Sequence, residues 1–379
     1  WRAASATPSA RSTASRADPM ESAAAPRPSS RLAAAFHGLE GGVLVVAFLV
    51  SMVLPLVDAV GRPFHGFSIP GSSTYRPQLT LWLAFLGGLL ATRERRHLTL
   101  STAEALGHAK AREAARLFSS AVAAVVCGVL AYSAAGVVAA DRLQGEMLQI
   151  GIPAWWSECV MPVALSLIAL QFAFGASRKW AGRLGALAFV GAVFALGHFA
   201  PAFLVKAVWP IAILILAAAL LGAPVFVAMG GLALLLFFKD DVPVSAVSAE
   251  VYRLIASPTL PAIPLLTAAG YILAEGGASH RLVRFFRALF GSLPGGIAVM
   301  VAAVCAIFTT FTGGSGVTII ALGGLLMPAL LKGGFSERFS LGLVTGTGSV
   351  GLLFPPALPL FVLGTVYGLN TTLAQKWDW

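Results

Sequence analysis

Long apolar stretches alternate with short polar ones along the chain, and this pattern predicts membrane-spanning helices. The stretches 117–140, 160–176 and 207–222 are almost free of charged residues. A helix needs about 20 apolar residues to cross the hydrocarbon core of a bilayer. Only helices and closed barrels satisfy every backbone hydrogen bond in lipid, and these stretches lack the two-residue alternation of a barrel strand. The pattern therefore predicts an all-α polytopic membrane protein that cannot fold as a soluble domain.

Basic residues in the connecting loops predict the orientation. Five arginines lie within 1–39, six basic residues within 92–116 and three within 177–183, whereas 61–77 and 141–154 hold two and one. Cytoplasmic loops carry an excess of Lys and Arg. The N-terminus is therefore expected in the cytoplasm, and four helices return the chain to that side near residue 180. These helices are expected over 39–60, 78–92, 115–140 and 154–177.

These elements predict four regions. Residues 1–38 include a segment rich in Ala, Ser, Pro and Arg without an apolar period, which predicts disorder. Residues 39–180 form a four-helix membrane domain. Residues 181–205 contain one linking helix, centred on 184–200, and 206–379 form a second membrane region.

The second region starts with a stretch that is too long for one helix. Residues 207–238 would extend about 48 Å as a continuous helix, so Gly222 and Pro224 are expected to divide it in two. A further helix over 260–276 is expected to cross inward. Arg281, Arg284 and Arg287 then give a basic, amphipathic face typical of the cytoplasmic interface.

Two short apolar arms, 297–312 and 317–331, flank the sequence Gly313–Gly316 (GGSG), and basic residues precede and follow the pair. Because both ends of the pair carry cytoplasmic charge, a re-entrant helical hairpin is favoured over a full span. Its tip is expected near the middle of the bilayer.

A second interruption is expected at TGTGSVG (345–351), followed by the prolines Pro355, Pro356 and Pro359. Irregular backbone at membrane depth is tolerated only in protein or around a watery cavity, and broken helices near the midplane are typical of secondary transporters. The alternative interpretation is that small residues let helices pack closely. The hydroxyl-bearing residues in and beside the two interruptions are Ser315, Thr318, Thr345, Thr347 and Ser349.

Composition and motifs narrow the function further. Hydrophobic residues make up 58% of the chain and charged residues 11%, and the net charge of +10 resides in short loops rather than in a nucleic-acid-binding patch. Cys127, Cys159 and Cys305 have no metal-ligand spacing and are expected to pack as free thiols. No P-loop, HExxH or GxSxG motif is present. The sequence thus predicts neither an enzyme nor a cofactor-binding protein.

Two polar residues near predicted helix ends are expected to have structural roles. Glu158 follows Trp155 and Trp156 and is expected to face the lipid headgroups with them. His97, in RERRHL, is expected in a solvated cytoplasmic turn.

Several of these motifs resemble a known family. Residues 260–296, the tip GGSG and residues 327–364 (MPALLKGGFSERFSLGLVTGTGSVGLLFPPALPLFVLG) resemble the large membrane subunit of TRAP (tripartite ATP-independent periplasmic) transporters. The first 180 residues, with WLAFLGGLLATRERRHL (82–98), resemble the small subunit. The chain is thus similar to a fused small-plus-large permease over about 40–368.

The resemblance implies a mechanism. A periplasmic solute-binding protein would deliver an organic acid anion, such as a C4-dicarboxylate or a sialic acid, and Na⁺ entry would drive its import by an elevator movement in the bacterial inner membrane. Na⁺ would be the coupling ion, with no other metal or cofactor. The residues carried over to a sodium site are Ser315, Gly316, Thr345, Thr347 and Gly348, and those expected at the substrate are Gly314, Thr318, Ser349, Pro355 and Pro356.

The sequence departs from this family in one major respect. The large subunit normally contains two inverted repeats with a hairpin each, whereas residues 206–379 contain only the first hairpin. A C-terminally truncated permease is therefore expected. Two other functions stay open: an elevator-type carrier that takes its substrate directly from solution, and a membrane scaffold subunit that does not transport.

Overall fold

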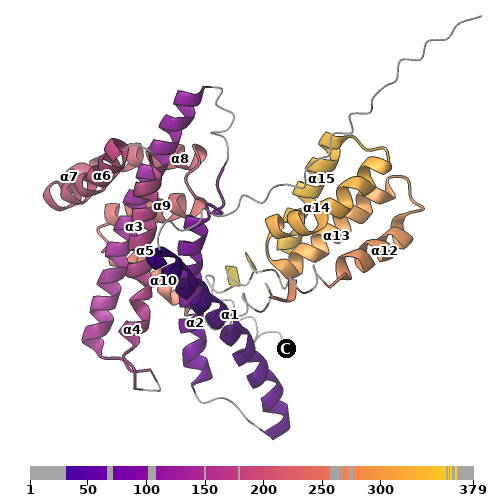
Figure 1. Ribbon diagram of the computed structural model, residues 1–379, viewed down its shortest axis with the longest axis horizontal. Helices are drawn as coiled ribbons and strands as arrows, with labels where there is room; N and C mark the ends of the chain where they lie inside the picture. Colours follow the sequence, from indigo (N-terminus) through magenta and orange to yellow (C-terminus); the bar gives the residue numbers. More distant parts are fainter. Residues whose placement is uncertain are drawn as a thin grey trace, which may run out of the picture. The chain divides into compact units, whose positions relative to one another are not determined.

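The chain folds mostly as α-helices in this computed structural model (Figure 1). The structure describes residues 31–65, 71–100, 108–148, 151–177, 180–256 and 276–355, with shorter pieces at 265, 268–270, 272, 357, 359–360 and 363–364. Within these residues, β-structure is limited to two isolated bridges, Thr99 with Pro224 and Met147 with Pro153. The prediction of an all-α protein is confirmed.

The helices up to residue 256 are α1 (Arg31–His65), α2 (Ser72–Arg93), α3 (Ala109–Gln144), α4 (Ala154–Glu158), α5 (Val160–Gly175), α6 (Trp180–Phe199), α7 (Pro201–Lys206), α8 (Val208–Leu220), α9 (Val225–Lys239) and α10 (Ser245–Ile255). The later helices are α12 (Ala278–Phe290), α13 (Gly296–Thr312), α14 (Ser315–Lys332) and α15 (Glu337–Val350), which continues into the 3₁₀ turn η2 (Gly351–Leu353).

Within the described residues, four segments are long and apolar enough to cross a membrane, and they correspond to predicted helices. They are Gly38–Asp58, Ala109–Gln144, Ala154–Gly175 and Trp180–Gly197. The last of these is α6, whose apolar window is only 6% buried inside the protein. Most of its side chains are therefore at least partly exposed, as contact with lipid requires.

Two predictions concern residues that the structure describes only in part. The helix α1 starts at Arg31, so the end of the segment predicted to be disordered is helical, while residues 1–30 lie outside the described residues. Most of the helix predicted over 260–276 also lies outside them.

Helix α3 forms the centre of the first group of helices, where it packs against α5, α6 and α10. Its inward face consists of small residues such as Ala123, Cys127 and Ala134, all with no exposed surface. Small side chains let helix backbones approach closely, which is the main source of packing between helices in lipid. Cys127 and Cys305 are buried and Cys159 is half-buried, and all three are free thiols, as predicted.

The predicted division of 207–238 is confirmed. Helix α8 ends at Leu220, Gly222 adopts a left-handed φ of 105°, and α9 begins after Pro224. The segment that follows α2 contacts this break, where the Val225 N–H donates a hydrogen bond to the Leu98 carbonyl at 3.0 Å.

Helices α12 to α15, here called the hairpin module, have their own core. Helix α13 contacts α12, α14 and α15. The buried side chains include Phe286 from α12, Val304 from α13, Leu326 from α14 and Val344 from α15. Each helix of the module therefore contributes to one apolar cluster. The connection between α13 and α14 lies at the edge of this cluster.

Candidate functional site at the hairpin tip

The turn between α13 and α14 is tighter than the GGSG motif predicted. Gly313 ends α13 with a φ of 69°, a conformation that favours glycine, and its N–H donates to the Thr309 carbonyl. Gly314 is extended (φ −145°) and precedes the first residue of α14, Ser315. Two residues therefore form the turn, and Ser315 and Gly316 are already helical. The two helices form the predicted hairpin, and its re-entrant course in the membrane stays a prediction.

Three threonines lie under this turn and share their hydroxyl groups. The Thr309 hydroxyl donates to Thr318 Oγ1 at 2.7 Å, and Thr312 Oγ1 lies 3.1 Å from the same atom. Thr318 Oγ1 in turn donates to the Gly314 carbonyl at 3.3 Å. All three side chains are buried. This network ties the end of α13 to the start of α14 and supports the turn from below.

The predicted interruption at 345–351 is wrong over most of its length. Helix α15 continues to Val350, and only Gly351–Leu353 leave the α-helical pattern, as a 3₁₀ turn. Thr345 and Thr347 donate their hydroxyls to the carbonyls of Leu341 and Leu343, four residues earlier, at 2.8 and 2.6 Å. Such bonds let Thr sit inside a helix.

Proline explains where the helix does end. Phe354 is extended (φ −102°, ψ 136°) and precedes Pro355. A residue before proline is pushed out of the helical region by the proline ring. The prolines, rather than the glycines and threonines before them, therefore end α15.

Helix α15 meets the hairpin tip at Gly348 and Ser315. A Cβ atom placed on Gly348 would lie 3.5 Å from Ser315 Cβ and 3.7 Å from the Ser315 carbonyl oxygen. Because Gly348 has no side chain, the backbones of α14 and α15 come into close contact here. Two of the predicted sodium-site residues thus lie side by side.

A second close approach joins η2 to α13. The Thr310 hydroxyl lies 3.1 Å from the Gly351 carbonyl, to which it donates. A Cβ atom on Gly351 would come within 2.2 Å of the Ala306 carbonyl oxygen and 2.7 Å of Thr309 Cβ. Only glycine fits at this position, so the end of α15 is held against α13.

The other predicted sodium-site residues divide between two surfaces. Thr347 is half-buried, whereas Thr345 is exposed. Gly316 is exposed at the start of α14. The tip therefore brings together Ser315 and Gly348, while Thr347, the residue before Gly348, lies near Cys305 of α13.

The predicted substrate residues are also dispersed. Gly314 is half-buried in the turn, whereas Thr318 has no exposed surface and uses its hydroxyl inside the threonine network. Ser349 and Pro355 are exposed. Pro356 lies outside the described residues.

Several further residues, not predicted from the sequence, shape the tip. Thr309, Thr310 and Thr312 belong to α13, where the run TTFT directly before GGSG was the available signal. Gly270 also approaches closely, since a Cβ atom on it would lie 2.9 Å from Thr312 Cα.

Charged side chains are absent from the described residues of α13, and those of α14 and α15 lie at the ends far from the tip, at Lys332, Glu337 and Arg338. The polar groups at the tip are therefore hydroxyls, backbone carbonyls and the free N–H groups at the start of α14. Oxygen ligands suit a hard cation such as Na⁺, and a helix N-terminus favours an anion.

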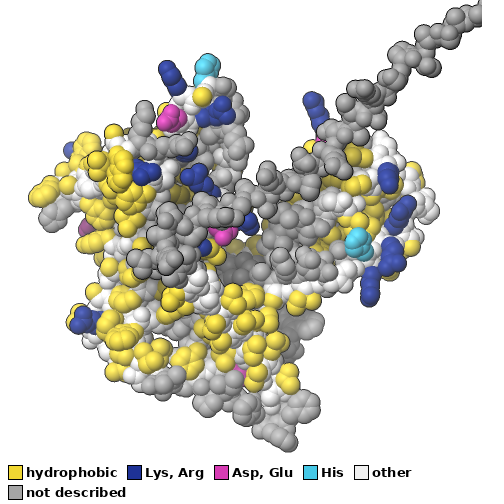
Figure 2. Space-filling model, in the orientation of Figure 1, with side chains coloured by type: hydrophobic (Ala, Val, Ile, Leu, Met, Phe, Trp, Pro, Cys, Tyr) yellow, Lys and Arg dark blue, Asp and Glu magenta, His cyan; other side chains and the backbone are white. Residues whose placement is uncertain are grey.

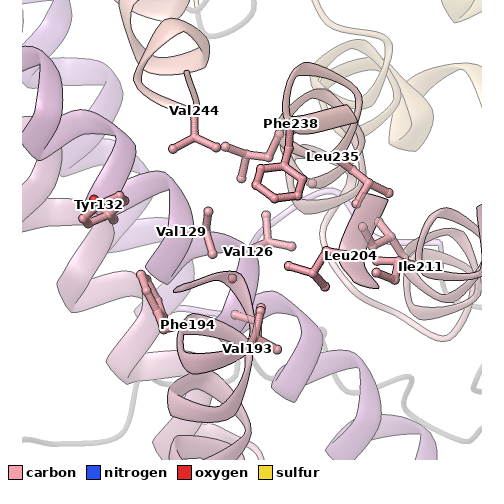
Figure 3. A pocket seen from close by; sticks show the side chains of 15 residues that line it. Val126, Val129, Tyr132, Val193, Phe194, Leu204, Ile211, Leu235, Phe238 and Val244 are labelled. Atoms are coloured by element: carbon pink, nitrogen blue, oxygen red, sulfur yellow. The ribbon is translucent and has the colours of Figure 1, made fainter. Parts of the chain in front are cut away.

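An apolar cavity of about 530 Å³ lies elsewhere, between α3, α6, α8 and α9. Val126, Phe194 and Phe238 point into it from three of these helices (Figure 3). The lining contains one polar side chain, Tyr132, and no charged one. This cavity has no group to neutralise a carboxylate and is a poor candidate for the substrate site.

His97 is not in a solvated turn as predicted. Its ring lies 5.0 Å from the ring of Phe226 on α9 and 6.2 Å from that of Phe172 on α5, between centroids. Its Nε2 lies 2.6 Å from Thr92 Oγ1. Because the apolar rings exclude water, burial lowers the pKa of His97 below its ordinary 6.5. The segment after α2 thus packs against α5 and α9.

Glu158 does not face the headgroups either. Its side chain is 2% exposed, whereas neighbouring Trp156 is 63% exposed. Ser157 accepts a hydrogen bond from Trp82 Nε1 at 3.0 Å, which fixes α4 against α2. This contact orients the turn so that Glu158 faces inward, toward Tyr252 of α10. Tyr252 also accepts a hydrogen bond from Gln78 of α2 at 3.1 Å.

Two models of known protein families match this chain, one in its N-terminal part and one in its C-terminal part. Residues 51–182 match the model of the tripartite ATP-independent periplasmic transporters, DctQ component. Residues 211–375 match the model of the DctM component of the same transporters. The two matches follow one another along a single chain.

Individual relatives agree with these matches. The C4-dicarboxylate TRAP transporter large permease protein DctM of Rhodobacter capsulatus is 32% identical over 38% of this chain and 33% of its own length. The isethionate TRAP transporter permease protein DctMQ of Oleidesulfovibrio alaskensis is 28% identical over 56% of this chain and 34% of its own length. The ectoine TRAP transporter large permease protein TeaC of Halomonas elongata is 29% identical over 40% of this chain and 36% of its own length.

The chain spans about a third of the length of these relatives. One of them, DctMQ, is named for both components, in agreement with the presence of both matches in this chain. Permeases of this kind are multi-pass inner-membrane proteins and not enzymes. The chain therefore belongs to the TRAP transporter permeases, as a fused form of the small DctQ and large DctM components.

Proposed function

We propose that this chain is the permease component of a sodium-coupled secondary transporter that imports an organic acid anion delivered by a periplasmic binding protein. The N-terminus would lie in the cytoplasm, and the hairpin module would move as part of an elevator. The observation that carries this proposal is the contact between Ser315 at the hairpin tip and Gly348 of α15.

The chemistry of this contact supports sodium. Ser315, Gly348 and Thr347 offer hydroxyl and carbonyl oxygens from two helices without a carboxylate to bind a divalent ion tightly. Hard monovalent cations are held by such neutral oxygen ligands at interrupted helices in secondary transporters. We assign the coupling ion to this position.

An anionic substrate is supported by two features. The first turn of α14 carries no acidic residue, so its N-terminus would attract a carboxylate or sulfonate. Relatives are named for C4-dicarboxylate and for isethionate, both anions, as well as for ectoine. The substrate class is accordingly proposed as an organic acid anion, with C4-dicarboxylates and sialic acids as first candidates.

The test is uptake by proteoliposomes that contain the permease carrying this chain. Radiolabelled succinate, sialic acid, isethionate and ectoine would be offered with and without a candidate periplasmic solute-binding protein. We expect uptake of one acid anion that depends on the binding protein. Equal uptake without the binding protein would instead support a direct-binding carrier, and no uptake of any compound would support a scaffold subunit.

A further inference from the structure

Helix α12 presents three different surfaces along its length. Its packed surface includes Phe286, which is 9% exposed, with Leu282 and Phe290 beside it in the core of the hairpin module. Successive residues of an α-helix are rotated by about 100°, so residues four apart share a side. Phe285 and Leu289 each directly precede a packed phenylalanine, Phe286 or Phe290, and are rotated by about 100° from it, so they lie beside the packed surface.

This second surface is apolar and uncovered. Phe285 is 62% exposed and Leu289 is 56% exposed. Side chains of this size on one side of a helix form a hydrophobic strip, and its exposure to water would be unfavourable. The strip thus indicates an apolar environment around this side of α12.

The third surface is basic. Arg281, Arg284 and Arg287 are all exposed and follow one another at intervals of about 4.5 Å along the axis. Helix α12 contains no acidic residue, and among the described residues none forms an ion pair with these three guanidinium groups. Figure 2 shows basic side chains gathered over this part of the module. The row is thus free to bind anions.

Further basic residues lie at one end of the same module. The link between α14 and α15 packs against the start of α13, where Ile297 Cδ1 lies 2.8 Å from the position of a Cβ atom on Gly333. Lys332 and Arg338 on either side of this link are exposed. Since the turn between α13 and α14 is at the opposite end of α13, these charges lie away from the candidate sodium site.

We propose that α12 lies in the membrane interface and binds the phosphate groups of anionic phospholipids through Arg281, Arg284 and Arg287, with Phe285 and Leu289 among the acyl chains. A basic side next to an apolar strip is the pattern of helices that lie flat on charged bilayers. Each arginine near an anionic surface contributes about fivefold to binding. Arginine also reaches from the apolar boundary to the headgroups through its long stem.

The first experiment measures how deeply the side chains of α12 lie in the bilayer. Single cysteines at Phe285, Leu289 and Arg284 are labelled with a fluorophore in the permease carrying this chain, after Cys127, Cys159 and Cys305 are replaced. The labelled protein is placed in vesicles with brominated phospholipid or in iodide solution. The probes at 285 and 289 should be quenched by brominated lipid, and the probe at 284 by iodide. Shielding of the 285 and 289 probes from both quenchers would show a protein partner and overturn the proposal.

The second experiment measures lipid selectivity. Phosphatidylglycerol retained by the permease is counted by native mass spectrometry after transfer from vesicles of phosphatidylcholine with phosphatidylglycerol. Replacement of all three arginines by Gln should lower the retained phosphatidylglycerol by about fivefold or more, whereas replacement by Lys should preserve it.

The matched control removes the same charge elsewhere. Lys110, Arg112 and Arg116 near the start of α3 are equally exposed but accompany the acidic Glu113. Their replacement by Gln should leave phosphatidylglycerol retention within about twofold of the unchanged protein. Equal losses in both triple variants, or no loss in the α12 variant, would contradict the proposal. Neither readout uses transport, so the result is independent of the proposed function.

Discussion

Gly348 of α15 lies against Ser315 of α14, with 3.5 Å between the position of its missing Cβ and Ser315 Cβ. This contact joins the two regions that the sequence pattern had marked as interruptions. It also limits the candidate sodium site to the groups that both helices present at this point. Thr347, the residue before Gly348, is half-buried, whereas Thr345 is exposed.

Replacement of Ser315 and Thr347 by Ala should therefore weaken sodium activation of uptake. Each change removes one oxygen ligand, for which a loss of about 1–2 kcal/mol in sodium binding is expected. The measurement is the sodium concentration that gives half-maximal uptake. Thr345→Ala and Ser349→Ala serve as controls, because both side chains are exposed. A larger effect of the controls would move the site away from the Ser315–Gly348 contact.

Replacement by alanine should have different effects on protein stability at two glycines of the same segment. Gly351→Ala would place a methyl group 2.2 Å from the Ala306 carbonyl oxygen, whereas no atom lies within 4 Å at Gly346. The crowded variant should lose about 1–3 kcal/mol of stability, and Gly346→Ala should be neutral or gain up to about 1 kcal/mol through helix propensity. Thermal unfolding of both variants in detergent measures the difference. Similar melting temperatures would argue against the close packing of η2 on α13.

The threonine network under the tip can be tested by a double-mutant cycle. Thr318→Val should cost about 1–3 kcal/mol, because it leaves the buried Thr309 hydroxyl without its acceptor. Thr309→Val combined with Thr318→Val should cost less than the sum of the two single changes, by about 0.5–1.5 kcal/mol. Unfolding free energies of the three variants give this coupling energy. Strict additivity would mean that the two hydroxyls do not interact.

The partly buried position of His97 predicts that the stability of the protein depends on pH. Thr92 donates its hydroxyl to the Gly88 carbonyl at 2.8 Å, so the 2.6 Å contact is made by His97 Nε2–H as donor. Burial lowers the pKa of His97 in the folded protein below its ordinary 6.5, and the unfolded chain therefore binds more protons near that pH. Stability should be full above about pH 6.5 and decrease as the pH falls toward the folded-state pKa.

The measurement compares thermal unfolding at several pH values for the unchanged protein and for His97→Gln, which cannot titrate. The dependence below the ordinary pKa should be weaker in the variant. An identical slope in both proteins would assign the effect to other groups.

The sequence predicted those parts of the fold that depend on local chemistry. Gly222 and Pro224 divide a long apolar stretch, and the structure has its break between them. The hairpin turn was also predicted, because no other residue adopts the conformation of Gly313 as readily.

The predictions were wrong where contacts between residues distant in sequence determine the local structure. TGTGSVG resembles a break by composition, but hydroxyl bonds to the preceding turn and packing against α13 and α14 keep it helical to Val350. For Glu158 and His97, the neighbouring residues in the sequence predict polar surroundings. Their actual neighbours come from α10 and α9, which are distant in sequence.

The most direct test of the sodium-coupling proposal is uptake under an imposed sodium gradient. Proteoliposomes containing the permease and supplied with its binding protein are diluted into buffer with Na⁺ outside and K⁺ inside, or with K⁺ on both sides. The account predicts that substrate accumulates only with the inward Na⁺ gradient and that a sodium ionophore abolishes the accumulation. Equal accumulation with K⁺ on both sides would contradict it.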